Sequence, residues 1–400
     1  MSLNERLNAL IIHAYDNAPA VKLILDEAGV SPSDIQSLAD LPKIPVTTKD
    51  QLVQMQQADL PFGGWLAVPK ESLKHIYVSP GPIFEVEGPD DEPDTGAFEA
   101  IGLGSSDLIL NTFMYHLVSA GILLDAGAQA VGATVIPTGP GNTDYQVQIM
   151  MGLGATAYTG TPSFLKIILD KAAEMQIPRQ AIPIKKALFS AEPYPPSLRN
   201  LFEQDYGMIT ANAYATAELG VVAYDRTGDA AMRIADSMIV EIVDPERGQP
   251  VPVGEVGHVV VTRFNNTYPL IRFGLGDLSA FVGEPDDEGY YRHIKGWMGR
   301  VGDAIKVRGM FLHPLQMKAA LGQFSQISNM QAIVTRSDTR DHVELRVETT
   351  DAIGDQPDLS DAIKTAVSNA CRLKVDTVTF VTAGSITADA RPVVDERSWD

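Results

Sequence analysis

Cysteine is almost absent from this sequence, because Cys371 is the single one among 400 residues. One cysteine excludes an intrachain disulfide and a cysteine-rich metal cage, and we expect Cys371 to be a small buried apolar side chain. An uninterrupted apolar run of about 18 residues is also missing, so no membrane span is expected. The N-terminal residues interleave charged and apolar side chains at helical spacing, unlike a signal peptide. These absences predict a cytoplasmic protein.

Basic residues are scarce relative to acidic ones. Lys and Arg number 31 against 51 Asp and Glu, which gives a formal net charge of −20. Binding to nucleic acid or to an anionic membrane requires a cationic surface, so neither is expected as a partner. A small anionic substrate remains compatible with this charge, since a local group of Arg and Lys can hold it. The 45% apolar content allows a large core and more than one domain.

The pattern of elements changes twice along the chain. Between residues 107 and 207, strands alternate with helices, which indicates parallel βαβ units. From Ile239 onward, short strands separated by turns are typical of an antiparallel, β-barrel-like subdomain. We therefore predict an α/β fold whose large N-terminal domain, residues 1–298, has layered α/β sheets and a small β-barrel subdomain. A small mobile α+β lid, residues 303–400, is expected after a hinge at 299–302.

Four motifs follow one another in the sequence. They are SAEP at 190–193, YATAE at 214–218, LIRFGLGD at 270–277 and GRVGDAIKVRG at 299–309. In this order they resemble the core motifs of the adenylate-forming superfamily, which holds acyl-CoA synthetases, peptide-synthetase adenylation domains and luciferases. The segment 111–146 is similar to the phenylacetate-CoA ligase branch of that superfamily. The resemblance covers nearly the whole chain and implies an AMP-binding domain joined to a rotating lid.

The resemblance assigns a set of residues to the nucleotide cofactor. They are Ser190, Ala191, Glu192, Pro193, Tyr214, Ala215, Asp277, Arg300, Lys306 and Arg308. The turn at 190–193 would bind adenine, although an ordinary strand-to-helix turn explains the same residues. Asp277 and Arg300 would hold the ribose hydroxyls, because a carboxylate accepts two such bonds and a guanidinium offers several donors. Gly302 would be the pivot of the lid, since glycine tolerates large changes of φ.

The resemblance also implies a metal and a catalytic role for the YATAE motif. Glu218 would hold Mg²⁺, because a hard cation that bridges phosphates needs a carboxylate. Ala217 stands where relatives have a threonine that contacts the α-phosphate, and Thr216 is one residue away but should face differently. Arg391, near the C-terminus, is the third residue assigned to catalysis, as a partial substitute for a lysine.

A pocket for the acid substrate is implied by the segment that resembles phenylacetate-CoA ligases. The residues assigned to it are Phe113, Tyr115, His116 and Tyr158. A buried, hydrogen-bonded structural role is an equal alternative for His116. The TGPGNT loop at 138–143 offers backbone N–H groups to an anion, but a plain strand-to-helix turn accounts for it as well.

Elements that relatives use to contact phosphate are altered in this sequence. The place of the Ser/Thr/Gly-rich phosphate loop is taken by residues 77–85, YVSPGPIFE, which contain two prolines and no lysine. Proline removes N–H donors, and Glu85 with the acids after it would repel a triphosphate. Asp389 aligns with the lysine that contacts the acyl carboxylate and the α-phosphate in relatives. The adenine and ribose motifs are intact, so the alteration is confined to the phosphate side.

The leading hypothesis is therefore an ATP-dependent carboxylic acid–CoA ligase of the phenylacetate-CoA ligase type. It would use ATP, Mg²⁺ and coenzyme A, form an acyl-adenylate from a small, preferably aromatic acid, and release AMP when a thiol displaces it. The alternative is a degenerate family member that binds nucleotide or acyl-CoA in a regulatory or partner role. A third interpretation retains only the thioester-forming half of the reaction. Relatives often form dimers, so a homodimer is compatible with this family.

Overall fold

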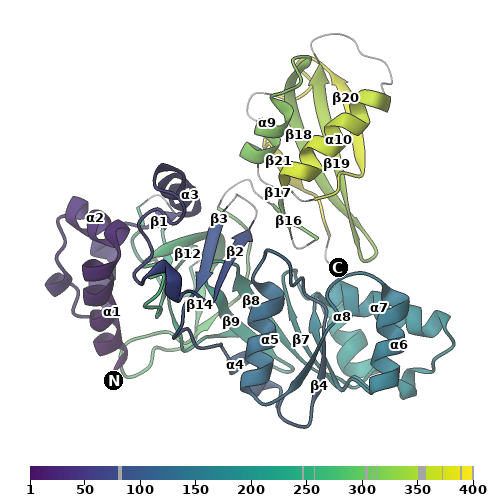
Figure 1. Cartoon of the computed structure of the whole chain (residues 1–400), viewed down its shortest axis with the longest axis horizontal. Coiled ribbons are helices and arrows are strands. Elements are labelled where there is room, and N and C mark those ends of the chain that lie inside the picture. Colours follow the sequence, from purple (N-terminus) through teal and green to yellow (C-terminus); the bar gives the residue numbers. More distant parts are fainter. Residues whose placement is uncertain are drawn as a thin grey trace. The chain divides into compact units, whose positions relative to one another are not determined.

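The structure is a computed structural model, and it describes residues 1–79, 83–245, 247–255, 257–301, 305–308, 310–312, 314–349, 357–371, 373–387 and 390–398. The chain divides into two compact units, Met1–Val301 and Gly302–Asp400 (Figure 1). Each unit has hydrophobic clusters of its own. Gly302, the expected pivot, lies outside the described residues, so the hinge stays a prediction.

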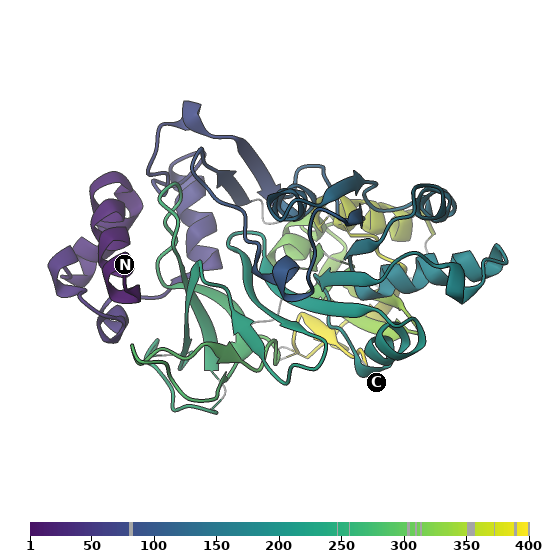
Figure 2. The ribbon, with the colours of Figure 1, turned by 90° about the horizontal axis from the view of Figure 1, so that it is seen from below.

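Two amphipathic helices begin the first unit, α1 (Leu3–Asn17) and α2 (Pro19–Ala28). Ser2 and Glu5 form a capping box at the start of α1. Pro19 occupies the first turn of α2, where its missing N–H costs no helical hydrogen bond. Leu7 and Ile11 lie fully buried in the core that these helices share with neighbouring strands. In Figures 1 and 2 these purple helices lie at one end of the first unit.

The largest sheet of the first unit has nine strands. They are β4 (Leu108–Asn111), β5 (Thr134–Pro137), β6 (Ala157–Gly160), β7 (Lys186–Ser190), β8 (Ile209–Thr216), β9 (Gly220–Arg226), β10 (Met232–Ile234), β14 (Phe281–Val282) and β15 (His293–Ile294). Their order is β14-β15-β10-β9-β8-β7-β6-β4-β5. The five strands from β5 to β8 are parallel, and the rest are antiparallel. The parallel part confirms the predicted βαβ alternation.

Helices cover both faces of this sheet. They are α4 (Gly96–Ala100), α5 (Ala120–Ala130), α6 (Thr143–Leu153), α7 (Pro162–Glu174) and α8 (Pro196–Asn200). Successive side chains of a strand point to opposite faces, so Leu188 packs with α4 and α5 while Phe189 packs with α6, α7 and α8. Burial on both faces explains why the central strands β4, β6 and β7 are mostly buried and largely apolar.

The strands expected to form a small barrel are divided between two sheets. The strands β14 and β15 belong to the nine-stranded sheet. The others form a four-stranded sheet, whose strands are β1 (Thr47–Thr48), β11 (Met238–Val243), β12 (Gly257–Arg263) and β13 (Phe273–Ser279). Its order is β1-β13-β12-β11, and β1 joins its edge in parallel. The turn pattern of the sequence indicated short antiparallel strands, but strand pairing between distant segments decides which sheet each one joins.

A hairpin and a helix lie beside this sheet. The hairpin pairs β2 (His75–Ser79) with β3 (Ile83–Glu87), and its tip, residues 80–82, is outside the described residues. The helix α3 (Lys49–Ala58) follows β1 directly. Thr48 caps it, with Gln51 completing a capping box, so the start of α3 is fixed to the edge of the sheet.

The second unit is a small α+β domain, as predicted. Its elements are β16 (Ile305–Val307), β17 (Met310–Leu312), α9 (Pro314–Leu321), β18 (Ile327–Ser337), β19 (Arg340–Thr349), α10 (Pro357–Cys371), β20 (Thr377–Thr382) and β21 (Val393–Asp395). Four strands form the sheet β20-β19-β18-β21, and β16 pairs with β17. Cys371 is buried in this unit's core, as expected from the sequence.

Candidate functional site

The carboxyl ends of β7 and β8 bring the first two motifs together. Ser190 is the register partner of Ala213, and its hydroxyl donates to the Ala213 carbonyl at 2.8 Å. Tyr214 follows Ala213 on the same strand, so the SAEP and YATAE motifs lie side by side. Ligands of open α/β sheets bind outside this edge, which makes it the natural place for a nucleotide.

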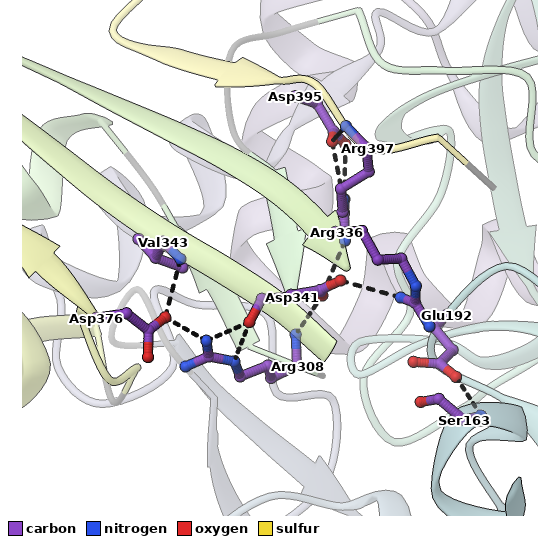
Figure 3. A network of polar contacts seen from close by, with 9 residues as sticks. All are labelled: Ser163, Glu192, Arg308, Arg336, Asp341, Val343, Asp376, Asp395 and Arg397. Carbon is purple, nitrogen blue, oxygen red and sulfur yellow. Dashed lines mark hydrogen bonds and ion pairs between the residues drawn. The ribbon is translucent and has the colours of Figure 1, made fainter. Parts of the chain in front are cut away.

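The turn after β7 is strained, and part of it has a structural task. Ala191 has φ +76°, a left-handed conformation that costs a non-glycine residue about 1–2 kcal/mol. The Glu192 carboxylate accepts a 2.7 Å hydrogen bond from the Ser163 amide at the N-terminus of α7 (Figure 3). An acidic side chain is favourable there because the helix N-terminus carries partial positive charge. Glu192 therefore caps a helix; its expected contact with the cofactor stays a prediction.

A buried carboxylate, Asp277, contacts two other residues that were assigned to the nucleotide. Asp277 lies on β13 and is only 3% exposed. The Tyr214 hydroxyl donates to its Oδ2 at 2.8 Å, and Arg300 Nε lies 3.0 Å from its Oδ1. Burial and the Asp277 charge raise the pKa of Tyr214 well above its usual value, so the tyrosine stays a neutral donor. The sequence brought these three residues into one hypothesis, and the structure places them in contact.

Trp297 is a member of this cluster that the sequence analysis missed. Its indole Nε1 donates to Asp277 Oδ1 at 3.2 Å. The residue stands three positions before Arg300, inside a segment whose backbone pairs with the end of β13. No family motif pointed to it, and its closeness to Arg300 in sequence is the one signal that was available.

Glu218 pairs with a lysine that sequence reasoning also missed. Lys49 Nζ lies 2.5 Å from Glu218 Oε1, and the Glu218 side chain is almost fully buried. Burial alone would raise the pKa of Glu218, but the charge and hydrogen bond of Lys49 outweigh it, so the pKa is lowered. Glu218 is therefore ionised at neutral pH. The two residues are far apart in sequence, and the pairing of β1 with β13 is what carries Lys49 to the site.

Thr216 supports the turn that carries Glu218. Its hydroxyl accepts a 3.3 Å hydrogen bond from the Leu219 amide and also bonds to Glu218, which helps to lower the pKa of that carboxyl. The side chain thus points into its own turn, in line with the expectation that it faces differently from the missing threonine. A direct catalytic contact of Thr216 stays a prediction.

Glu85 differs from its expected role as a repelling charge. It is buried on β3, and Ser79 Oγ donates to its Oε1 at 2.5 Å. Burial first, and then the nearby Glu218 charge, raise the pKa of Glu85 to about 8, against opposing contributions from Ser79 and Lys49. At pH 7 the carboxyl is therefore mainly neutral, because the cost of a buried charge exceeds the stabilisation by Lys49. A neutral Glu85 would not repel a triphosphate.

The residues assigned to the acid pocket separate in the structure. Tyr158 is fully buried within the core, where its hydroxyl donates to the Thr161 carbonyl and accepts from Thr112, both at 3.0 Å. The Tyr158 ring packs against Phe189, and both side chains are fully buried. Tyr158 therefore has no exposed surface for a ligand, and its position does not support the pocket role. The resemblance assigned Tyr158 to the pocket, whereas in the structure its side chain packs with the residues of α6, α7 and α8.

Phe113, Tyr115 and His116 lie on one loop after β4. Phe113 is buried, Tyr115 bonds through its hydroxyl to Asp125 at 2.7 Å, and His116 is exposed. The alternative of a buried structural histidine is therefore wrong for His116. The backbone carbonyl of Leu117, the residue after His116, accepts a 2.7 Å hydrogen bond from the Val78 amide of β2. The loop is therefore attached to the hairpin that carries Glu85.

Residues assigned to the site in the second unit have partners within that unit. Arg308 donates to the Asp341 carbonyl and pairs with Asp376, while Asp341 also binds Arg336 at 3.0 Å and Arg397 at 3.1 Å (Figure 3). This network fixes β16 to the sheet of the second unit. The cofactor role of Arg308 stays a prediction.

Three further assignments of the second unit are less constrained by the structure. The Arg391 carbonyl accepts from Gln331 at 2.9 Å, and its side chain is exposed. Lys306 lies in β16, and Asp389 lies outside the described residues. The catalytic role of Arg391 and the cofactor role of Lys306 therefore remain predictions.

The residues present fit a magnesium ion that is shared with a phosphate. Glu218 is a buried, ionised carboxylate, which is the ligand type that Mg²⁺ prefers. Within the described part of the chain, no group of three or more His, Cys, Asp or Glu could hold a metal alone. A single carboxylate suits an ion that completes its shell with phosphate oxygens and water.

Two family models match the chain. The AMP-binding enzyme model matches residues 99–267, and the model for the C-terminal domain of AMP-binding enzymes matches residues 309–397. A phenylacetate-coenzyme A ligase of Thermus thermophilus is 30% identical over 363 residues, which cover 86% of this chain and 80% of that protein. The chain belongs to the adenylate-forming, AMP-binding enzyme family.

Other relatives support the same family. A phenylacetate-coenzyme A ligase of Aromatoleum evansii is 28% identical over 410 residues, covering 98% of this chain and 90% of that protein. A solved 2-hydroxyisobutyryl-CoA ligase, in complex with 2-HIB-AMP and CoA, has a TM-score of 0.89 at 26% identity and covers 99% of this chain and 89% of its own. These matches confirm the predicted superfamily and fold, and the family's ligases use ATP and CoA. Within the described residues, no helix has the length and apolarity to cross a membrane.

Proposed function

We propose that this protein is an ATP-dependent carboxylic acid–CoA ligase of the phenylacetate-CoA ligase type. The acid's carboxylate would attack the α-phosphorus of ATP and release pyrophosphate, which leaves an acyl-adenylate. The thiol of CoA would then attack the acyl carbon, lose its proton and release AMP. The observation that carries the proposal is the buried carboxylate of Asp277, held between Tyr214 and Arg300 in an AMP-binding enzyme fold.

The chemistry of such a site is mainly positioning and charge neutralisation. Asp277 and Arg300 would hold the ribose, which fixes the α-phosphate relative to the acid. Lys49 is the described cation beside Glu218, and it would neutralise charge that develops on the phosphate oxygens. Magnesium, when bound by Glu218 and the nucleotide, would add a second positive charge at the same place.

The acid is proposed to be aromatic and small. Its pocket would be formed by the loop after β4, where Phe113, Tyr115 and His116 lie. Phe113 and Tyr115 supply apolar aromatic surface, and Tyr115 is held in place by its bond to Asp125. The phenylacetate-coenzyme A ligases among the relatives favour this class of acid for the proposal.

The test is ATP–pyrophosphate exchange with a panel of aromatic and aliphatic acids. The proposal predicts exchange that depends on the acid and is fastest with an aryl acetate or benzoate. Thioester formation would be followed in the same samples by loss of the free CoA thiol. Exchange with none of the acids, together with tight AMP binding, would contradict the ligase and favour the degenerate alternative.

One observation favours the degenerate alternative as a second candidate. The place of the phosphate loop is next to a buried carboxyl, Glu85, and the carboxylate for magnesium is already paired with Lys49. A site organised in this way holds an adenylate more readily than a triphosphate, because less negative charge has to be neutralised. Asp389→Lys would discriminate: a gain of exchange in this variant indicates that adenylation was lost at that residue.

A further inference from the structure

Trp297 occupies an unusual position for an exposed aromatic residue. The residue is 46% exposed, yet its indole N–H donates to Asp277, which is 3% exposed. Its backbone is held on both sides: the Lys295 amide donates to Ala280 and the Met298 amide to Leu278, each at 2.9 Å. The backbone of this segment is therefore fixed, whereas the side chain of Trp297 has solvent on one side to turn into.

The hydrogen-bonding capacity of Asp277 is almost used up. An ionised carboxylate has about four lone-pair sites for donors. Among the described residues, Tyr214 takes one on Oδ2, and Arg300 and Trp297 take two on Oδ1. A ribose brings two hydroxyl donors. One remaining site is too few for both, so one of the present donors has to leave.

Trp297 is the donor that leaves most easily. Its bond is the longest of the three, 3.2 Å against 2.8 Å for Tyr214 and 3.0 Å for Arg300. Arg300 carries a charge, and a charge-assisted bond is stronger than one from a neutral indole. Tyr214 is less exposed than Trp297 and makes the shortest of the three bonds, so its hydroxyl loses more by leaving than the indole does. The exposed indole can instead donate to solvent.

We propose that Trp297 is a specificity residue of the ribose site, seated where one ribose hydroxyl binds. Its indole N–H occupies Asp277 Oδ1 in the ligand-free protein, and a nucleoside diol displaces it. The inference rests on the proposed binding of an adenylate at Asp277. Ligands that lack the two hydroxyls cannot compete for Oδ1 and leave the indole in place. Because only the diol has to displace the indole, Trp297 lowers the preference of the site for ribose over sugars without the diol.

The test is calorimetric titration of wild-type protein and Trp297→Phe with AMP and with 2′,3′-dideoxy-AMP. Phenylalanine keeps an aromatic ring but has no N–H, so the competition for Oδ1 is removed. We expect AMP to bind about fivefold to tenfold more tightly to Trp297→Phe, the value of one hydrogen bond to a charged acceptor less the return of the indole to water. The dissociation constant of dideoxy-AMP should be the same in both proteins.

A neighbouring variant gives the matched control. Met298→Leu changes the next exposed side chain, which cannot donate a hydrogen bond to Asp277. The affinities of this variant for AMP and for dideoxy-AMP should equal those of wild type. Tryptophan fluorescence gives a second measurement, made in a Trp399→Phe background because Trp399 lies outside the described residues. AMP should change the emission of this protein, and adding Trp297→Phe should remove most of that change, since the remaining Trp65 is buried.

The outcomes separate this inference from the function on which it rests. If wild type binds AMP and Trp297→Phe binds it equally or more weakly, the inference is overturned and nucleotide binding stands. If dideoxy-AMP gains as much affinity as AMP, the effect is not competition for the diol, and the inference is again overturned. If neither protein binds AMP, the proposed function fails and the inference fails with it.

Discussion

The nucleoside side and the phosphate side of the site are organised differently. On the nucleoside side, Asp277 has three donors within 3.2 Å, so most of its hydrogen-bonding capacity is used before any ligand arrives. On the phosphate side, Lys49 pairs with an ionised carboxylate, Glu218, and its charge also acts on a carboxyl that holds its proton, Glu85. The first arrangement is built for recognition of a sugar. The second carries little net charge and depends on a single cation.

The largest effect is expected from breaking the nucleoside side. Asp277→Ala removes the acceptor of both ribose hydroxyls, so AMP affinity should fall by about 100-fold or more, the value of two bonds to a charged group. Titration calorimetry measures it. Asp236→Ala is the control, because Asp236 is an exposed acid paired only with an exposed arginine in the described contacts. Unchanged AMP binding in Asp277→Ala would place the nucleotide elsewhere.

Removal of the Lys49 charge on the phosphate side should weaken binding of the nucleotide's phosphate and leave binding of the nucleoside unchanged. In Lys49→Met, AMP is expected to bind about tenfold more weakly, because one charge contact is lost, while adenosine binds as in wild type. The variant should also lose about 3 kcal/mol of unfolding free energy, since the buried charge of Glu218 is left without its cation. Lys43→Met, which breaks an exposed pair with Asp40, is the control. Equal weakening of AMP and adenosine would contradict a phosphate role for Lys49.

The raised pKa of Glu85 predicts a pH dependence of stability that comes from the phosphate side alone. Its folded pKa of about 8 lies above the ordinary value of 4.5, so the folded state binds this proton more tightly than the unfolded state. The stabilisation is complete below about pH 4.5 and is lost as the pH rises to about 8. Relative to Glu85→Gln, wild type should lose up to about 1.4 kcal/mol of unfolding free energy per pH unit in that interval.

Urea unfolding of both proteins at several pH values between about 5.5 and 8.5 measures this difference. Parallel profiles for wild type and Glu85→Gln would show that Glu85 ionises in its normal range. The phosphate side would then carry an additional negative charge at neutral pH, and the contrast with the nucleoside side would become larger.

The smallest effect is expected from a residue that belongs to neither side. Tyr158→Phe removes a hydroxyl with two buried partners, so the unfolding free energy should fall by about 1 kcal/mol. AMP affinity and the order of preferred acids in pyrophosphate exchange should not change. An altered acid preference would return Tyr158 to the substrate pocket, against its position in the core.

The nucleoside side could be predicted from sequence because its residues stand in short motifs. Tyr214, Asp277 and Arg300 were identified from three strings of 5–11 residues. The predicted α/β alternation ends at residue 207, just before the strand β8 that carries Tyr214. The fold itself follows from strong periodic patterns. Only the distribution of the late strands between two sheets departed from the expected barrel, because sheet membership depends on long-range pairing.

The phosphate side could not be predicted in the same way. Lys49 reaches Glu218 from 169 residues away through the pairing of β1 with β13, and no local pattern encodes that contact. The proton on Glu85 is a consequence of burial, which the acidic character of its segment concealed. Trp297 was near a motif but outside it. The burial of Tyr158 in the core was likewise not visible in its sequence context, from which the resemblance assigned it to the pocket.

Nucleotide binding at Asp277 is tested most directly by titration of the wild-type protein with adenosine, AMP and ATP, each with and without magnesium. We expect adenosine and AMP both to bind, AMP to bind more tightly because Lys49 contacts its phosphate, and neither to require the metal. The absence of binding heat for adenosine, AMP and ATP, with and without magnesium, would contradict a nucleotide site at Asp277.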